Sequence, residues 1–192
     1  MFKLLGKLLG RDFTSATPEV EITETLSDAE IMRELNPHLA RKTDLRRFMQ
    51  FMSAHLPSVE AKRLTRLVVA ALPEADSPCH AIELAIFGDD GQQLEHMLFA
   101  YVDWKAPEEI AWQVNGLLLT RQVNEIWQAT ASATVPDELT ALATWLAARE
   151  LSLLQIDTEN DAYCFAILPQ QDFPKACQLA TSAGLTILAG SA

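Results

Sequence analysis

The sequence predicts an α+β fold: a mixed, mainly antiparallel sheet from two ββα units with covering helices, preceded by an N-terminal helical hairpin. Apolar residues recur at helical spacing up to about residue 72, whereas short apolar runs separated by turn residues begin at residue 79. With 192 residues, 49% of them hydrophobic and 21% charged, the chain is large enough to bury a core without disulfide bridges. We divide it into an amphipathic segment and linker (1–26), a helical hairpin or three-helix segment packed on the rest (27–72) and an α+β domain (73–192).

The N-terminal residues 1–10, MFKLLGKLLG, place leucines opposite Lys3 and Lys7 at helical spacing. This pattern is typical of an anchor that makes weak contact with a membrane surface. A ten-residue helix with two glycines is marginal in water, however, so a tail or a helix docked on protein is favoured over an anchor. The polar residues 11–26 predict a linker.

Three helical segments, 27–36, 43–56 and 58–72, predict the hairpin or three-helix segment. Ser27 begins the first, and we expect Pro37 to follow its end. The second and third carry these apolar stripes: Leu45, Phe48, Met49, Met52 and Leu56, and then Leu64, Leu67, Val68 and Ala71.

The first ββα unit is predicted from strands at Cys79–Phe87 and Leu94–Asp103, joined by a hairpin turn at 88–91, and from a helix that begins at Pro107. The second unit has strands at Leu151–Ile156 and Tyr163–Leu168 and a helix near Phe173–Ser182. The remaining expected elements are a helix over 136–149 and a short strand over 185–188, and residues 120–134 stay unassigned between helix and strand.

Two segments carry a resemblance to a known family. They read FAYVDWKAPEEIAWQ at 99–113 and LLQIDTENDAYCFAILP at 153–169. The sequence resembles an uncharacterised bacterial family, a domain of unknown function, in which a strand ends in Asp-Trp-Lys and an Ile-Asp-Thr…Asp-x-Tyr hairpin follows. The resemblance covers about residues 80–188. It supports the fold and implies no activity.

Charge is unevenly distributed along the chain. The net charge is −11, yet residues 1–66 carry 11 basic and 9 acidic residues, whereas residues 67–192 carry 4 and 17. An excess of acid disfavours nucleic acid as a general partner and favours a basic protein. The longest apolar runs are six residues, too short to span a bilayer, and the three cysteines form no CxxC pair. We therefore expect a cytoplasmic protein with reduced cysteines, no cofactor and no metal site.

Asp103, Trp104 and Lys105 form the most distinctive candidate binding site, because they end a predicted strand directly before a helix. Trp112 and Tyr163 are candidates for lining the same cleft. The alternative is structural: the aspartate satisfies loop amides, the tryptophan packs at a core edge and the lysine is solvated.

A basic patch on the helical hairpin is a second candidate surface. Its members lie off the apolar stripes: Arg46, Arg47, Lys62, Arg63 and Arg66. Aromatic residues are scarce beside them, so stacking on bases is not indicated. Nucleic acid, the acidic half of the same chain and an acidic partner are all alternatives for this patch.

Two further groups of residues resemble functional sites without meeting the requirements of one. The turn at 157–161 places three carboxylates as a calcium loop does, but Ala162 and Leu168 stand where glycine and glutamate are required. Cys79 and His80 are expected on opposite faces of a strand, with His96 paired to Glu83 across the hairpin, so no catalytic residue is assigned.

The leading hypothesis is thus a non-enzymatic interaction protein that meets a basic partner with its acidic α+β surface, for example in the manner of an immunity protein that neutralises a toxin. One alternative is a small-molecule-binding domain or enzyme with a cleft around Asp103, Trp104 and Lys105. The other is nucleic-acid binding through the basic hairpin. The sequence does not determine the oligomeric state.

Overall fold

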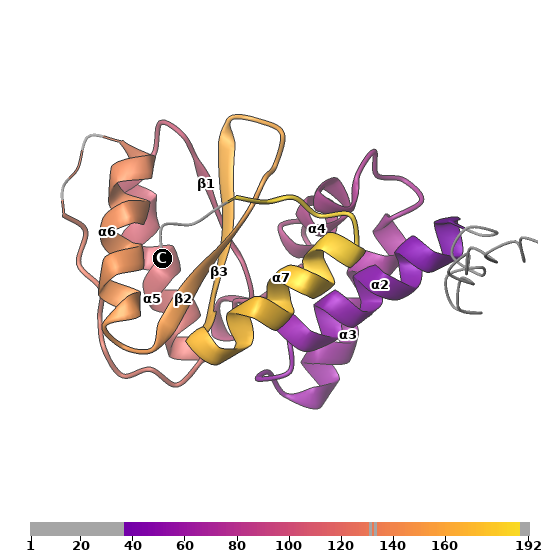
Figure 1. Ribbon diagram of the computed structural model, residues 1–192, viewed down its shortest axis with the longest axis horizontal. Coiled ribbons are helices and arrows are strands. Elements are labelled where there is room, and N and C mark those ends of the chain that lie inside the picture. The colour runs from indigo at the N-terminus through magenta and orange to yellow at the C-terminus, as the bar shows by residue number, and fades with distance from the viewer. Residues whose placement is uncertain (1–36, 131, 133, 189–192) are drawn as a thin grey trace, which may run out of the picture.

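The computed structural model of the protein describes residues 37–130, 132 and 134–188. The predicted anchor at 1–10, the linker at 11–26 and the helix at 27–36 lie outside these residues. The described chain has an α+β fold, as predicted, with one four-stranded sheet between two groups of helices (Figure 1). Within this described part, no helix combines the length and the apolar character that crossing a bilayer requires.

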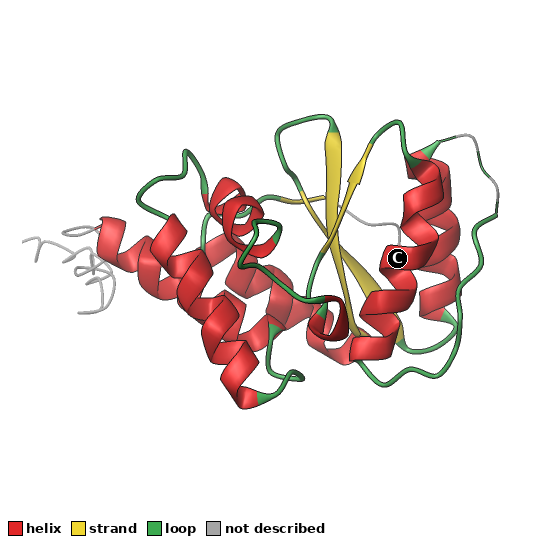
Figure 2. Cartoon of the chain, turned by 180° about the vertical axis from the view of Figure 1, so that it is seen from behind, coloured by secondary structure: helices red, strands yellow, loops and turns green. Residues whose placement is uncertain are grey.

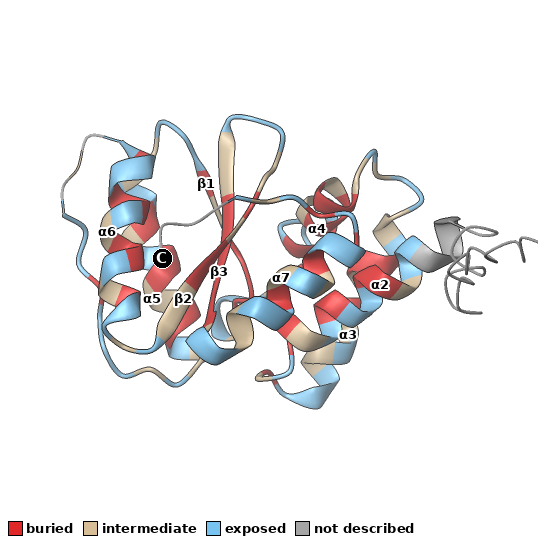
Figure 3. Ribbon diagram, in the orientation of Figure 1, coloured by how far each residue is buried: buried red, intermediate tan, exposed pale blue. Residues whose placement is uncertain are grey.

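The sheet has the strand order β1-β3-β2-β4, and all three neighbouring pairs are antiparallel. Its strands are β1 (Ala100–Asp103), β2 (Leu151–Ile156), β3 (Ala162–Pro169) and β4 (Ile187–Leu188). The central strand β3 is buried from Cys164 to Leu168 (Figure 3). An apolar run without alternation is what a strand covered on both faces requires.

Helices cover both faces of the sheet. Alternate β3 residues point to opposite sides, so that Phe165 and Ile167 belong to one core while Cys164, Ala166 and Leu168 belong to the other. The first core is completed by α5 (Ile110–Thr120) and α6 (Val135–Ala147). The second is completed by α2 (Pro37–Met52), α3 (Ser58–Ala71), α4 (Pro78–Ile86) and α7 (Phe173–Ser182).

Helices α2 and α3 form the predicted helical hairpin, and their apolar stripes are mostly buried in the second core. The start of α2 was predicted wrongly, because this helix begins at Pro37 and not at Thr43. Proline is well tolerated in the first turn of a helix, where its missing N–H has no intrahelical partner to lose. The helix therefore begins six residues before the predicted start at Thr43.

The segment Cys79–Phe87 was predicted as a strand and is helix α4. Ser77 caps it by accepting a hydrogen bond from the backbone N–H of His80 at 3.1 Å, and Pro78 occupies the first turn. The buried residues Ala81, Ile82, Ala85 and Ile86 follow the helical spacing. The β-branched, aromatic and leucine residues of this segment favoured a strand in the prediction, whereas the cap and the spacing favour a helix.

The first predicted ββα unit consequently does not exist. The turn at 88–91 follows a helix, with the N–H of Gly91 donating to the carbonyl of Gly88 at 2.8 Å. Only Ala100–Asp103 of the predicted Leu94–Asp103 strand is a strand, because Leu94–His96 forms a short 3-10 turn. His96 does not pair with Glu83 across a hairpin, and Glu83 instead accepts a hydrogen bond from the Tyr101 hydroxyl at 3.1 Å.

The second ββα unit is confirmed as β2, β3 and α7, and Gly184 ends α7 with a left-handed φ of 79°. Helices α5 and α6 each bury a stripe of apolar residues at helical spacing, which includes Ile110, Val114 and Leu117 in α5 and Leu139, Leu142 and Leu146 in α6. The described residues from 121 to 134 contain neither helix nor strand, and run as a loop seen best from behind (Figure 2). Asn115 fixes this loop by two hydrogen bonds to the backbone of Trp127, whose side chain is buried.

Candidate functional site

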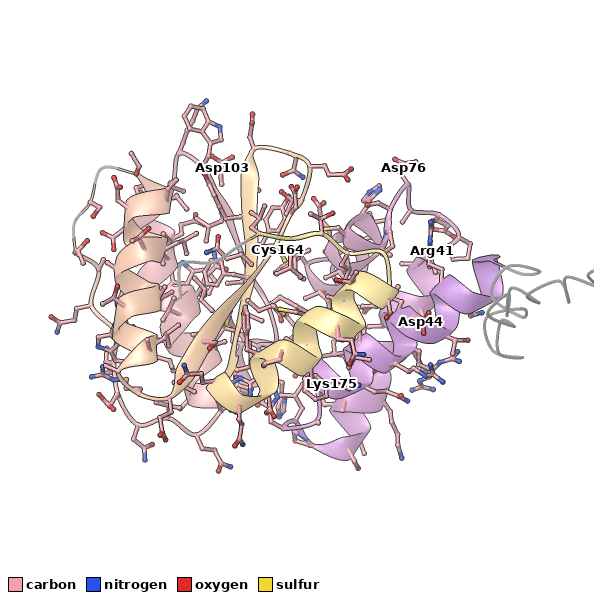
Figure 4. All side chains as sticks on the ribbon, viewed as in Figure 1. Arg41, Asp44, Asp76, Asp103, Cys164 and Lys175 are labelled. Atoms are coloured by element: carbon pink, nitrogen blue, oxygen red, sulfur yellow. The ribbon has the colours of Figure 1, made fainter. Side chains whose placement is uncertain are left out.

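The loop after β1 meets the turn between β2 and β3 at one end of the sheet, next to the label of Asp103 in Figure 4. The N–H of Trp104 donates to the carbonyl of Asp161 at 3.0 Å. The Asp103 carboxylate accepts a hydrogen bond from the N–H of Lys105 at 2.8 Å, which closes the loop on itself. Trp104 is thereby held with 49% of its surface exposed, and the Lys105 Nζ lies 4.7 Å from the centre of its ring.

Side chains within the 157–161 turn satisfy its backbone. Asp157 accepts a hydrogen bond from the N–H of Glu159, and Asn160 accepts one from the N–H of Ala162, both at 2.9 Å. Glu159 has a left-handed φ of 58°, and both Glu159 and Asp161 are exposed. The described part of the chain holds no group of three or more side chains placed to bind a metal ion.

Helix α4 adds a further carboxylate to this end of the sheet. The Tyr101 hydroxyl, which donates to Glu83, also accepts a hydrogen bond from the Asn160 side-chain amide at 3.1 Å. Burial raises the pKa of Tyr101, so its hydroxyl stays protonated at neutral pH and donates to the carboxylate. We use the name acidic rim for the residues gathered here, which are Glu83, Asp103, Trp104, Asp157, Glu159 and Asp161.

The cysteines next to the acidic rim are poor nucleophiles. Burial, with smaller contributions from the charges of Glu83, Asp157 and Glu159, raises the pKa of Cys79 to about 11. Burial likewise raises the pKa of Cys164 well above its ordinary value. His80 is engaged elsewhere, because its Nδ1 accepts a hydrogen bond from the N–H of Asp76 at 3.3 Å.

The five predicted binding residues do not line one cleft. Asp103, Trp104 and Lys105 lie together in the loop after β1, whereas Tyr163 packs against the core formed with α5 and α6. Trp112 is 53% exposed on α5 and lines a different pocket of about 320 Å³, beside the edge strand β1. The other lining residues of that pocket that are aromatic or apolar are Ile86, Phe87, Leu94, Met97 and Tyr101.

Two glutamines that the sequence analysis did not single out cover the edge strand β1 and the two residues before it. The Gln113 side chain accepts a hydrogen bond from the N–H of Tyr101 at 2.8 Å and donates one to its carbonyl at 2.9 Å. Gln92 accepts from the N–H groups of Leu98 and Phe99 and donates to the Phe99 carbonyl. These side chains take the place of a neighbouring strand, so they close the sheet edge to further pairing. The available signal in the sequence was Gln113, a polar residue three positions after Ile110 and therefore on the apolar stripe of α5.

The predicted basic patch is divided by the structure. Arg47 lies 3.4 Å from Asp44, and Arg63 makes two hydrogen bonds with Glu60 at 2.7 and 2.6 Å. Arg63 also donates to the carbonyls of residues 90 and 91, and so ties the loop after α4 to α3. The other three members, Arg46, Lys62 and Arg66, line a groove of about 640 Å³ between α2 and α3. The groove itself was not predicted from sequence.

The protein thus has an α+β fold with an antiparallel sheet that is covered on both faces. It carries two surfaces of opposite charge, the acidic rim and the groove lined by Arg46, Lys62 and Arg66. The chain belongs to the family described as Domain of unknown function (DUF6630), which matches residues 21–190. This confirms the resemblance seen in the sequence and extends it over the helical hairpin, which the resemblance left uncovered. A search of curated proteins found no match, and a search of solved structures found none either.

Proposed function

We propose that the protein is a non-enzymatic binding protein that docks a basic partner protein on its acidic rim. The observation that carries this proposal is the hydrogen bond from Trp104 to Asp161, because it joins the loop that carries this exposed aromatic side chain to the β2–β3 turn. That turn contributes three carboxylates to the acidic rim, and β1 contributes a fourth. A fifth carboxylate, Glu83, is anchored by Tyr101.

The arrangement suits recognition of a protein surface rather than of a small ligand. A cluster of exposed carboxylates accelerates the encounter with a positively charged partner. Tryptophan is among the residues that most often dominate binding energy at interfaces. Because hydrogen bonds from backbone N–H groups to side-chain oxygens fix the loop and the turn, little conformational entropy would be lost when a partner docks.

Two features support a role without catalysis. The buried thiols have raised pKa values and so do not supply a thiolate at neutral pH. The Asp103 carboxylate is occupied by a backbone amide of its own loop. An enzyme or small-molecule site around Asp103, Trp104 and Lys105 is less well supported, because the pocket beside β1 takes in Trp112 but neither Trp104 nor Tyr163. Toxin neutralisation is one form of the proposal, supported by charge alone.

The experiment is an affinity capture from a lysate of the source cells at 50 and 300 mM salt, followed by binding kinetics with the recovered protein. Four baits are compared: the wild type, W104A, E159K and E150K. Glu150 is a matched control, because it is an exposed glutamate with a left-handed φ of 56°, at the opposite end of β2 from Glu159.

We expect a basic protein to be recovered at 50 mM salt by the wild type and by E150K, and to be depleted at least tenfold with W104A and E159K. Its association rate with the wild type should fall as salt is raised. Recovery of no basic protein at either salt concentration, or equal recovery by all four baits, would contradict the proposal.

A further inference from the structure

The groove between α2 and α3 combines apolar residues with cations that have no ion-pair partner within the described part of the chain. Its apolar and small lining residues are Ala54, Leu56, Val59 and Ala61, and its charged lining residues are Arg46, Lys62 and Arg66. Val59 has 79% of its surface exposed, and the buried Thr65 hydroxyl has no hydrogen-bond partner among the described residues. We call this surface the basic groove. Its α2–α3 connection lies at the bottom of Figure 1, and the β2–β3 turn of the acidic rim lies at the top.

The three cations of the basic groove are available for a partner. Within the described residues, Arg46, Lys62 and Arg66 make no ion pair or side-chain hydrogen bond, in contrast to Arg47 and Arg63. An apolar floor flanked by unpaired cations is complementary to a segment that carries both acidic and apolar side chains.

The chain contains such a segment directly before α2. Residues 19–35 lie outside the described residues, so their character is taken from the sequence alone. They include one basic residue, Arg33, and these six acidic residues: Glu19, Glu21, Glu24, Asp28, Glu30 and Glu34. Their large apolar residues are Val20, Ile22, Leu26, Ile31, Met32 and Leu35. The family match begins at residue 21, so most of this segment belongs to the same family unit as the groove.

We propose that residues 19–35 dock in the basic groove of their own chain. Helix α2 begins at Pro37, and its rise of about 1.5 Å per residue puts Arg46 about 14 Å and Gln50 about 20 Å from that point. Seventeen residues reach about 25 Å even when fully helical, which is enough to return along α2 over the groove. The more distant residues 1–11 carry Lys3, Lys7 and Arg11, the wrong sign for this surface.

Hydrogen–deuterium exchange of the full chain tests this contact. The variants are R46E/K62E in the groove, K105E/K175E as a control with the same change in net charge, and the fourfold E24K/E30K/R46E/K62E, in which the signs are exchanged. In the wild type we expect amides within residues 27–35 to exchange at least tenfold more slowly than in an unstructured peptide. R46E/K62E should abolish this protection, K105E/K175E should keep it, and the fourfold variant should restore at least half of it.

Several results would overturn the proposal. Random-coil exchange of residues 27–35 in the wild type would show that they are not docked, and unchanged protection in R46E/K62E would place them elsewhere. Protection that grows with protein concentration, together with a dimer in sedimentation, would make a second copy the occupant. Binding of a labelled single-stranded RNA by the wild type at 150 mM salt, lost in R46E/K62E, would show the groove to be open to nucleic acid. Failure of the fourfold variant to regain protection would exclude the charge pairing.

Discussion

The acidic rim and the basic groove differ in how their charges are held. In the acidic rim, carboxylates lie at the end of β1, on α4 and in the β2–β3 turn, and hydrogen bonds to the backbone fix this turn and the loop that carries the exposed Trp104. In the basic groove, long cationic side chains project from two helices, without partners in the described part of the chain, beside an apolar floor. The rim thus has a preformed geometry. In the groove, the described part of the chain supplies neither acidic partners for the cations nor apolar side chains over the exposed apolar residues. The first suits a separate partner, and the second suits a segment that carries both acidic and apolar side chains.

This comparison implies that the rim depends on the strand beneath it. Replacing Gln113 by leucine should have the largest effect, because it leaves the N–H and carbonyl of Tyr101 without their side-chain partners at the sheet edge. We expect a loss of about 3 kcal/mol in the free energy of unfolding, measured by urea denaturation. Gln93→Leu at an exposed position is the control and should change it by less than about 0.5 kcal/mol. Equal losses in both variants would show that Gln113 does not support the edge.

The second prediction separates paired from unpaired cations on α3. Arg63→Ala removes the bidentate pair with Glu60 and the bonds to the 90–91 carbonyls, so it should lower the free energy of unfolding by about 2 kcal/mol. Arg66→Ala, one helical turn away, should change it by less than about 0.5 kcal/mol. Denaturation of both variants at the same pH and salt provides the comparison. The reverse ranking would mean that the groove cations, and not Arg63, are the structural ones.

The third prediction concerns the turn of the acidic rim. The Asn160 side chain accepts hydrogen bonds from Ala162 and Thr158 and donates one to Tyr101. Because the site is exposed, Asn160→Ala should cost only about 1 kcal/mol of stability. The amount of basic partner captured by the Asn160→Ala variant should fall by a larger factor than this small loss of stability explains, because the turn would lose its fixed shape. Glu159→Gln, which removes a charge but no turn hydrogen bond, should leave stability unchanged within about 0.5 kcal/mol.

The fourth prediction concerns how the free energy of unfolding changes with pH, through His55 in the α2–α3 connection. Burial, together with the charge of Arg121, lowers the pKa of His55 from 6.5 to about 4. Between these values the unfolded chain binds the proton and the folded chain does not, so stability falls as pH falls from 6.5 toward 4. His55→Gln should flatten this fall, and Arg121→Gln should weaken it. Urea denaturation at pH 7, 6, 5 and 4.5 measures the slope; an identical slope in His55→Gln would assign the effect to other groups.

The elements that sequence analysis predicted correctly carry strong local signals. Helix α6 has a proline and two acidic residues in its first turn, and a regular apolar stripe buried against the sheet. The β2–β3 hairpin has two apolar runs around a turn rich in Asp and Asn. In these segments, local preference and tertiary packing favour the same structure, so the pattern alone was sufficient.

The segment Cys79–Phe87 shows where local reading fails. Seven of its nine residues are apolar, two of them isoleucines, so the segment fits a buried strand as well as a buried helix. The cap from Ser77 and the packing of α4 against α3 decide in favour of the helix. The acidic rim was half predicted, because Asp103, Trp104 and Lys105 were chosen, but their approach to Asp161 joins positions nearly 60 residues apart.

By itself, the sequence determined the α+β class, the β2–β3 hairpin, the helical hairpin and the division of charge between the two parts of the chain, because each follows from local composition and periodicity. Only the tertiary structure decided which charges are partnered. Neighbours in one predicted patch, such as Lys62 and Arg63, have opposite roles because one faces the groove and the other reaches the loop after α4. Whether a cation has a partner depends on which side chains and carbonyls from distant parts of the sequence lie beside it in the fold, and no local sequence pattern encodes that.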